Sequence, residues 1–165
     1  MKRAYGSDKT PLIECINPDL RKFRIRWDYR LEEEGGVSFM EAETLYRPSM
    51  QIVREIVLNG YNEIVDERII SGFKWKGYDV WLSTENQFNY KAAFDLAVQT
   101  NGVNLPIKFK FGTTDNPQYY TFETVQDLGD FYGRAMGYIN EQLQWGWETK
   151  DSIDWGEYER QLNAI

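Results

Sequence analysis

The side chains with the clearest potential for catalysis are carboxylates in the second half of the chain. They are Asp127, Asp130, Glu141, Asp151 and Asp154. Two carboxylates that converge in a cleft act as acid and base in glycoside hydrolysis. The spacing of these residues does not require any two of them to converge, and an acidic chain offers many such pairs. We therefore expect no catalytic residue and no enzyme activity.

Composition restricts the other kinds of chemistry. The chain has no histidine and one cysteine, Cys15, which excludes Ser-His-Asp and Cys-His catalysis and removes the commonest zinc ligand. The run 113–116 offers oxygen ligands for calcium but fits no EF-hand spacing, so a turn is favoured. The polar run 85–89 is better explained by helix capping than by anion binding. We expect no metal and no cofactor.

Aromatic residues near the C-terminus offer a different function. Trp145, Trp147 and Trp155 lie close together among polar residues. Exposed aromatic side chains stack on sugars or dominate protein interfaces, whereas buried ones would close the end of a core, and the sequence leaves both alternatives open. The candidate interface residues are Trp145, Trp147, Trp155, Tyr158, Tyr5 and Leu12.

Length and charge limit the classes of partner. A chain of 165 residues with 42% hydrophobic and 16% aromatic residues is long enough for one domain with a sizeable core. Its net charge of −7 makes nucleic acid a poor partner, because phosphate contacts need clustered Lys and Arg. No stretch is typical of a signal peptide or a membrane span. We expect synthesis in a cytoplasm, with no membrane partner.

The first part of the chain predicts a β-hairpin. Residues 1–20 have no periodicity and are interpreted as an arm, with a short strand at 12–16. Strict alternation predicts a strand over 21–31, a loop over 32–36 and a return strand over 37–46. A phase slip at Phe39–Met40 indicates a bulge in the return strand. The residues expected on the buried face are Phe23, Ile25, Trp27, Tyr29 and Leu31, and we expect Glu41 and Glu43 to pair with the facing arginines.

A helix is expected to follow the hairpin. Arg47–Pro48 suits a first helical turn, and Gly60 is a typical residue just beyond a helix end. The segment 62–71 is then a linker with a strand in its second half, and a sub-boundary of the domain is possible there. The rest of the chain, 21–165, is expected to form a single domain.

The central stretch has the most distinct local signals. Two strands over 73–82 are joined by a turn at Lys76–Gly77, and Thr84 with Gln87 forms a capping box at the start of a helix. That helix ends near Asn101–Gly102. Its expected core stripe is Phe88, Ala92, Ala93, Leu96 and Ala97.

A second hairpin and a long helix follow. Strands at 107–111 and 119–122 flank a turn over 112–117, and Thr124 caps the helix. The expected stripe of this helix is Val125, Leu128, Tyr132, Ala135, Met136, Ile139 and Leu143. The tail from Gly146 is expected to end in a short helix starting at Glu157. The fold class is therefore α+β, with short antiparallel strands packed on two main helices and an N-terminal hairpin-plus-helix extension.

Four segments resemble one family. GFKWKGYDVWLSTENQFNY, LPIKFKF, TTDNPQYYTF and GWETKDSIDW occur in the order and spacing of an uncharacterised domain found in bacteriophage tail proteins and prophages. The wording is similar to the version in phages of Bacteroides-type bacteria. The resemblance covers roughly residues 69–155 and leaves the first 60 residues unexplained. It implies a tail-associated or virion role and supplies no site residues.

These observations lead to one expected function and two alternatives. The first is a non-enzymatic virion structural protein of the tail or baseplate, made in the host cytoplasm and present in several copies that contact other phage structural proteins. The second is a tail-fibre assembly chaperone with one apolar groove. The third is a carbohydrate-binding or carbohydrate-cleaving accessory protein, with coplanar exposed aromatics beside a carboxylate.

Overall fold

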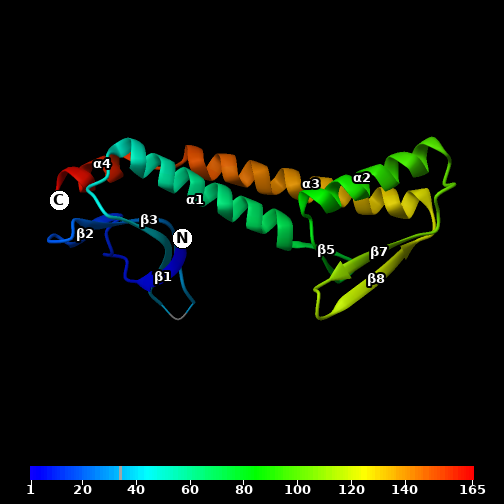
Figure 1. Cartoon of the computed structure of the whole chain (residues 1–165), viewed down its shortest axis with the longest axis horizontal. Coiled ribbons are helices and arrows are strands. Elements are labelled where there is room, and N and C mark those ends of the chain that lie inside the picture. The colour runs from blue at the N-terminus through cyan, green and yellow to red at the C-terminus, as the bar shows by residue number, and fades with distance from the viewer. Residues whose placement is uncertain (34) are drawn as a thin grey trace. The chain divides into compact units, whose positions relative to one another are not determined.

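The computed structural model describes residues 1–33 and 35–165 and confirms the α+β class, with helices and antiparallel sheets (Figure 1). The chain divides into two compact units. The first unit contains residues 1–64 and 148–165, and the second contains residues 65–147. The division falls in the interval 62–71, but inside a helix and not in a linker. None of the helices in the described chain is both long and apolar enough to cross a membrane.

The first unit contains a four-stranded antiparallel sheet. Its strands are β1 (Lys2–Gly6), β2 (Ile13–Asn17), β3 (Lys22–Leu31) and β4 (Val37–Thr44), in the order β1-β4-β3-β2. The predicted arm is therefore wrong, because residues 1–20 contain both outer strands. Short strands of this kind lack periodicity when neither face is fully buried. Glu34, in the predicted hairpin loop, lies outside the described residues.

The bulge lies in β3 and not in β4, as predicted from Phe39–Met40. The register between β3 and β4 shifts between Trp27 and Arg30, and Asp28 has a φ of +53°. The extra residue changes which side chains face the core beyond it. Trp27 is therefore buried, whereas Leu31, also expected to be buried, is 88% exposed.

Helix α1 (Met50–Ser71) is longer than predicted. Gly60 does not end it, and no strand forms over 62–71. A Cβ at Gly60 would lie 2.3 Å from an atom of the Trp27 indole, so the glycine allows the ring to pack against the helix backbone. The apolar stripe continues past it with helical spacing, through Ile64, Val65 and Ile69, all buried.

The C-terminal residues return to the first unit. Helix α3 (Val125–Asp151) continues past Gly146, where the tail was predicted to begin, and α4 (Trp155–Asn163) starts earlier than the predicted Glu157. Asp154 caps α4 by accepting a hydrogen bond from the Glu157 N–H. The buried Tyr158 donates a hydrogen bond from its hydroxyl to the Arg26 carbonyl, at 2.7 Å.

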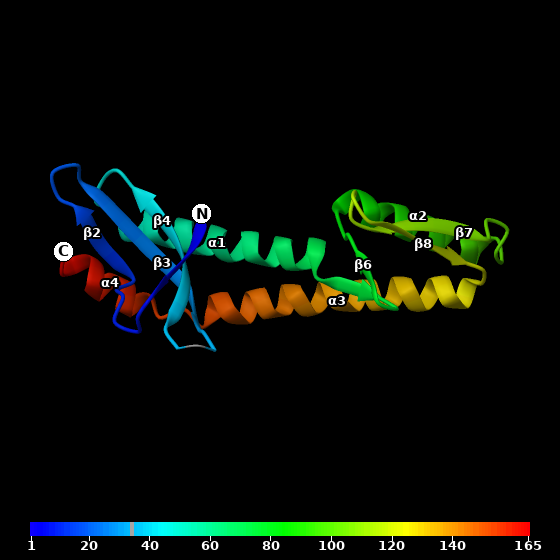
Figure 2. The same ribbon diagram turned by 90° about the horizontal axis from the view of Figure 1, so that it is seen from below.

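The second unit contains two hairpins and parts of three helices. Its elements are the end of α1, β5 (Phe73–Trp75), β6 (Tyr78–Val80), α2 (Thr84–Gln99), β7 (Ile107–Gly112), β8 (Pro117–Phe122) and α3 up to Trp147 (Figure 2). Lys76 and Gly77 both have positive φ, 47° and 87°, as a type I′ turn requires. Both hairpins and the Thr124 cap confirm the predictions.

The core of this unit is aromatic and centres on Phe131. The Phe131 ring is fully buried and contacts Trp75, Tyr90 and Phe122, with ring centroids 5.4, 5.0 and 5.1 Å away. Phe131 was missing from the predicted stripe of α3. Leu128 and Ala135, which were in that stripe, are also fully buried.

The prediction for α2 was wrong in its cap and in its buried face. Ser83, and not Thr84, accepts the hydrogen bond that caps the helix, from the Asn86 N–H. The side chains buried on this helix are Tyr90, Ala93 and Ala97. Phe88 and Leu96 were expected in the core but are 70% and 47% exposed.

Candidate functional site

The two outer strands of the four-stranded sheet are treated differently. On β2, the Ile13 N–H and the adjacent Leu12 N–H donate to the Gln161 side-chain oxygen of α4, at 3.2 and 2.7 Å. On β1, no further strand lies alongside in the described residues. An outer strand presents unpaired N–H and C=O groups that can pair with another chain. The β1 edge is therefore the place where this sheet can be extended.

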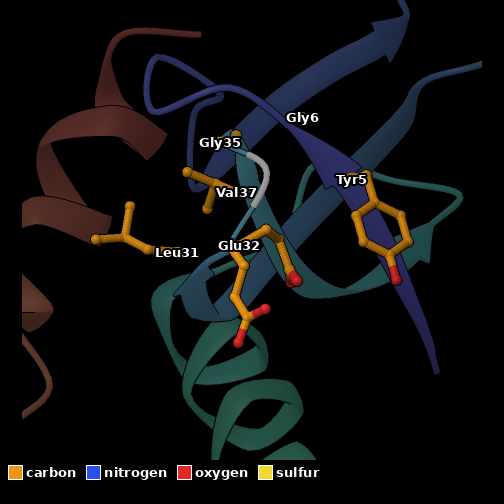
Figure 3. Close-up of a pocket in the computed structure, with 8 residues that line it drawn as sticks. Tyr5, Gly6, Leu31, Glu32, Gly35 and Val37 are labelled. Atoms are coloured by element: carbon orange, nitrogen blue, oxygen red, sulfur yellow. The ribbon is translucent and has the colours of Figure 1, made fainter.

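A groove lies beside the end of β1. Its volume is about 610 Å³, and its lining includes Tyr5 of β1, Leu31 of β3 and Glu32 of the hairpin loop. In Figure 3 Tyr5 and Leu31 lie on either side of Glu32. Tyr5 is 75% exposed and Leu31 is 88% exposed. The groove thus combines two apolar side chains open to solvent with an acidic rim, to which the exposed Glu33 also contributes.

Ion pairs fix β1 in place. Arg3 pairs with the Asp28 carboxylate and donates to the Ser38 hydroxyl at 3.1 Å. Arg30 also contacts the Asp28 carboxylate, at 2.8 Å. Asp28 is the bulge residue with positive φ, so the bulge places a carboxylate between two arginines. The groove and the edge are therefore held by the same irregularity that exposes Leu31.

The interior of this sheet also contains charged groups. Arg26 and Glu41 are 3% and 4% exposed and lie 3.4 Å apart, and Arg26 also pairs with Glu14 at 2.8 Å. Arg24 pairs with Glu43 at 2.7 Å, so the predicted pairing of the glutamates with arginines is confirmed. Hydrogen bonds from Arg24 and then Lys22 lower the pKa of Glu43 from 4.5 to about 2.

The predicted interface residues are divided between the two units. In the first unit Tyr5 lines the groove, Leu12 is half-buried, and Tyr158 is part of the core. Trp155 is half-buried and lies under the Arg54 guanidinium, 4.5 Å from its ring centroid. Tyr5 is thus the residue of this unit that the structure leaves open to a partner.

The second unit contains the other two tryptophans. Trp145 is half-buried beneath the Arg68 guanidinium, 3.9 Å from its ring centroid, and Trp147 is 58% exposed. Both arginine contacts show that tryptophan and cation were paired within one unit. The sequence signal for this is the helical position of each pair, which becomes visible only when the helices are known.

Several residues with chemical potential have structural roles. Asp130 pairs with Arg134 at 3.0 Å, one helical turn away. Thr113 and Asn116 close a turn, because the Asn116 N–H donates to the Thr113 hydroxyl at 3.1 Å. Within the described sequence, no group of three or more His, Cys, Asp or Glu residues is arranged to hold a metal ion.

Asp127 belongs to a polar cluster on the second unit. Lys76 donates to the Tyr120 hydroxyl at 2.5 Å and to the Asp127 carboxylate at 2.8 Å, and Tyr120 donates to the same carboxylate at 2.8 Å. Burial raises the pKa of Asp127, but the hydrogen bonds from Lys76 and Tyr120 outweigh it and lower the pKa overall. The hydrogen bond to Asp127 raises the pKa of Lys76. A lysine that acts as a nucleophile needs a lowered pKa, so this cluster is an ion pair.

A second pocket lies on the same unit. Its volume is about 450 Å³, and its lining includes Trp81, Asn86, Lys110 and Thr113. Trp81 is 53% exposed. An exposed indole beside hydroxyl and amide groups is the kind of surface on which a sugar ring stacks.

No protein-family model, curated protein or solved structure matches this chain.

Proposed function

We propose that this chain is a non-enzymatic structural protein of a bacteriophage particle, associated with the tail or baseplate, and that it binds neighbouring subunits through the β1 edge. The observation that supports this proposal is the contrast between the two outer strands. The β2 end donates to Gln161, whereas β1 has an open edge and a groove at its end. The resemblance over residues 69–155 supplies the phage context.

The physical basis of binding is strand addition. A neighbouring segment that pairs with β1 gains main-chain hydrogen bonds, and side-chain pockets beside the edge provide specificity. Tyr5 and Leu31 are the apolar contacts available to such a segment. Glu32 and Glu33 on the groove favour a partner segment with Lys or Arg at its end.

The experiment is incorporation of variants into particles. Infected cells that express tagged protein are allowed to assemble virions, and the tag is quantified in purified particles. Tyr5→Asp places a charge in the groove, and we expect incorporation to fall about tenfold or more, as for a central interface aromatic. Leu45→Asp is the matched control, because Leu45 is 73% exposed on the same unit but does not line the groove. Equal incorporation of both variants would contradict the proposal.

The Trp81 pocket supports carbohydrate binding as a second candidate function. Stacking of a sugar on the Trp81 indole would change tryptophan fluorescence when host glycans are titrated. We expect Trp81→Ala to remove that change, and Trp147→Ala to leave it intact, since Trp147 is 58% exposed but outside the pocket. No change with any host glycan would remove this candidate.

A further inference from the structure

Helix α2 presents an apolar stripe to solvent. Phe88 is 70% exposed, Leu96 is 47% exposed, and Ala92 between them is exposed. With 3.6 residues per turn, Phe88 and Leu96 lie about 40° on either side of Ala92 around the helix axis. The opposite side of α2 is already used within the unit, where Phe94 stacks on Tyr132 at 5.1 Å. The stripe therefore has no partner in the described part of its own unit.

The polar residues around this stripe have a symmetric arrangement. Glu85 and Gln99 lie equally far before and after Ala92, and so do Asn89 and Asp95. All four are within about 60° of Ala92 around the helix. On each side of Ala92, one member of a pair is a carboxylate and the other is an amide.

We propose that two copies of this chain associate through α2, with the helices antiparallel and related by a twofold axis at Ala92. In a twofold interface, residue i of one copy meets residue j of the other, and j meets i. Phe88 then meets Leu96 of the second copy, on both sides of a small residue that permits close approach.

The same pairing satisfies the polar rim. Glu85 of one copy lies opposite Gln99 of the second copy, and Asp95 lies opposite Asn89, so each carboxylate meets an amide N–H₂ that can donate to it. Lys91 remains paired with Asp95 of its own chain. No two like charges are brought face to face by this arrangement, which is why we commit to a second copy of this chain as the occupant. The inference uses the α2 surface alone and goes beyond the proposed function.

The first test is the concentration dependence of the molar mass in solution, by analytical ultracentrifugation of the purified full chain. We expect a reversible dimer for the natural sequence. Phe88→Asp should weaken it at least about tenfold, because it buries a charge against Leu96. Val98→Asp is the matched control, since Val98 is 53% exposed on the same helix but turned away from the stripe. A monomer at every concentration would overturn the inference.

The second test locates the dimer contact. Ala92→Cys, in a chain with Cys15→Ser, places a thiol at the proposed axis, so mild oxidation should link the two copies. Adding Phe88→Asp should abolish the link, and Val98→Cys in the same background should give none. A dimer that forms no link at residue 92 would place the contact elsewhere and overturn the inference.

A third test addresses the antiparallel direction. Asn89→Lys places an ammonium opposite Asp95 of the second copy and should tighten association by about twofold to fivefold, whereas Asn89→Asp should weaken it by a similar factor. An identical dissociation constant for both variants would exclude this register.

Discussion

The two units of this protein are stabilised by different interactions. Residues 65–147 pack around the aromatic ring of Phe131, which is fully buried. The sheet of the other unit contains Arg26 and Glu41, which are 3% and 4% exposed. Apolar burial is favourable in any arrangement that excludes water, whereas a buried ion pair is stable only in one geometry. The aromatic unit thus gains most from packing, and the charged unit gains most from correct strand register.

The irregular features follow the same difference. The hairpins of the second unit are closed by short regular turns, such as Lys76–Gly77. In the first unit the bulge at Asp28 directs a carboxylate toward Arg3 and Arg30 and leaves Leu31 exposed. The open β1 edge and its groove occur in the unit whose strands are fixed by charge. We infer that binding surface and charged sheet are parts of one arrangement.

The largest expected effect is loss of the aromatic centre. Phe131→Ala removes a fully buried ring with neighbours on several elements, and we expect the free energy of unfolding to fall by about 4 kcal/mol. Hydrogen exchange would show the loss as faster exchange of amides in 65–147. Unchanged protection in that range would contradict the central position given to Phe131.

The second prediction concerns the buried charges. Glu41→Ala leaves Arg26 with Glu14 as its remaining carboxylate partner, and we expect a loss of about 3 kcal/mol, because an uncompensated charge stays buried. Replacing both residues with apolar ones, as in Arg26→Met with Glu41→Leu, should restore most of that stability. Chemical denaturation measures both. A double variant as unstable as the single one would show that the charges contribute more than geometry.

The third prediction separates two glycines that occupy helices. At Gly60, an added Cβ would meet the Trp27 ring at 2.3 Å, so Gly60→Ala should destabilise by about 2 kcal/mol despite the better helix propensity of alanine. Gly137→Ala is the matched control, because a Cβ there meets nothing within 4 Å, and it should stabilise by up to about 1 kcal/mol. Thermal melts of the two variants should shift in opposite directions. A stabilising effect at Gly60 would show that Trp27 does not pack on the helix.

The smallest expected effect is on pH dependence. The pKa of Glu43 is lowered from 4.5 to about 2 by Arg24 and Lys22, so the folded state prefers the ionised form. This contribution is present above pH 4.5 and is lost as the pH falls toward 2. We expect Glu43→Gln to flatten the melting temperature slightly between pH 5 and pH 2, and the effect is small because Glu43 is exposed. An identical pH profile would show that the pair does not persist in solution.

The sequence predicted best those features that depend on a few adjacent residues. The turn at Lys76–Gly77 and the cap at Thr124 are local, and both were predicted. Gly60 was misread because glycine is common beyond helix ends, and only the position of Trp27 explains why this one lies inside a helix. The bulge at Asp28 gave no signal, since its cause is the charge of two arginines that the fold brings near.

The candidate site was harder to predict for the same reason. Tyr5 was identified as an interface residue, but Leu31 was expected in the core because its alternation with Trp27 is regular in sequence. In α2, apolar residues occur on both sides of the helix, so spacing alone favoured Phe88 and Leu96 over Tyr90 as the buried face. The correct choice depends on Phe131, which lies on another helix.

The most direct test of the proposed function is mass spectrometry of purified virions, with intensities converted to copies per particle. We predict a stoichiometric signal in a multiple of three or six, as expected for a tail or baseplate component. Absence from virions, with the protein present in infected cells, would contradict this account and favour an assembly chaperone that uses the same β1 edge transiently.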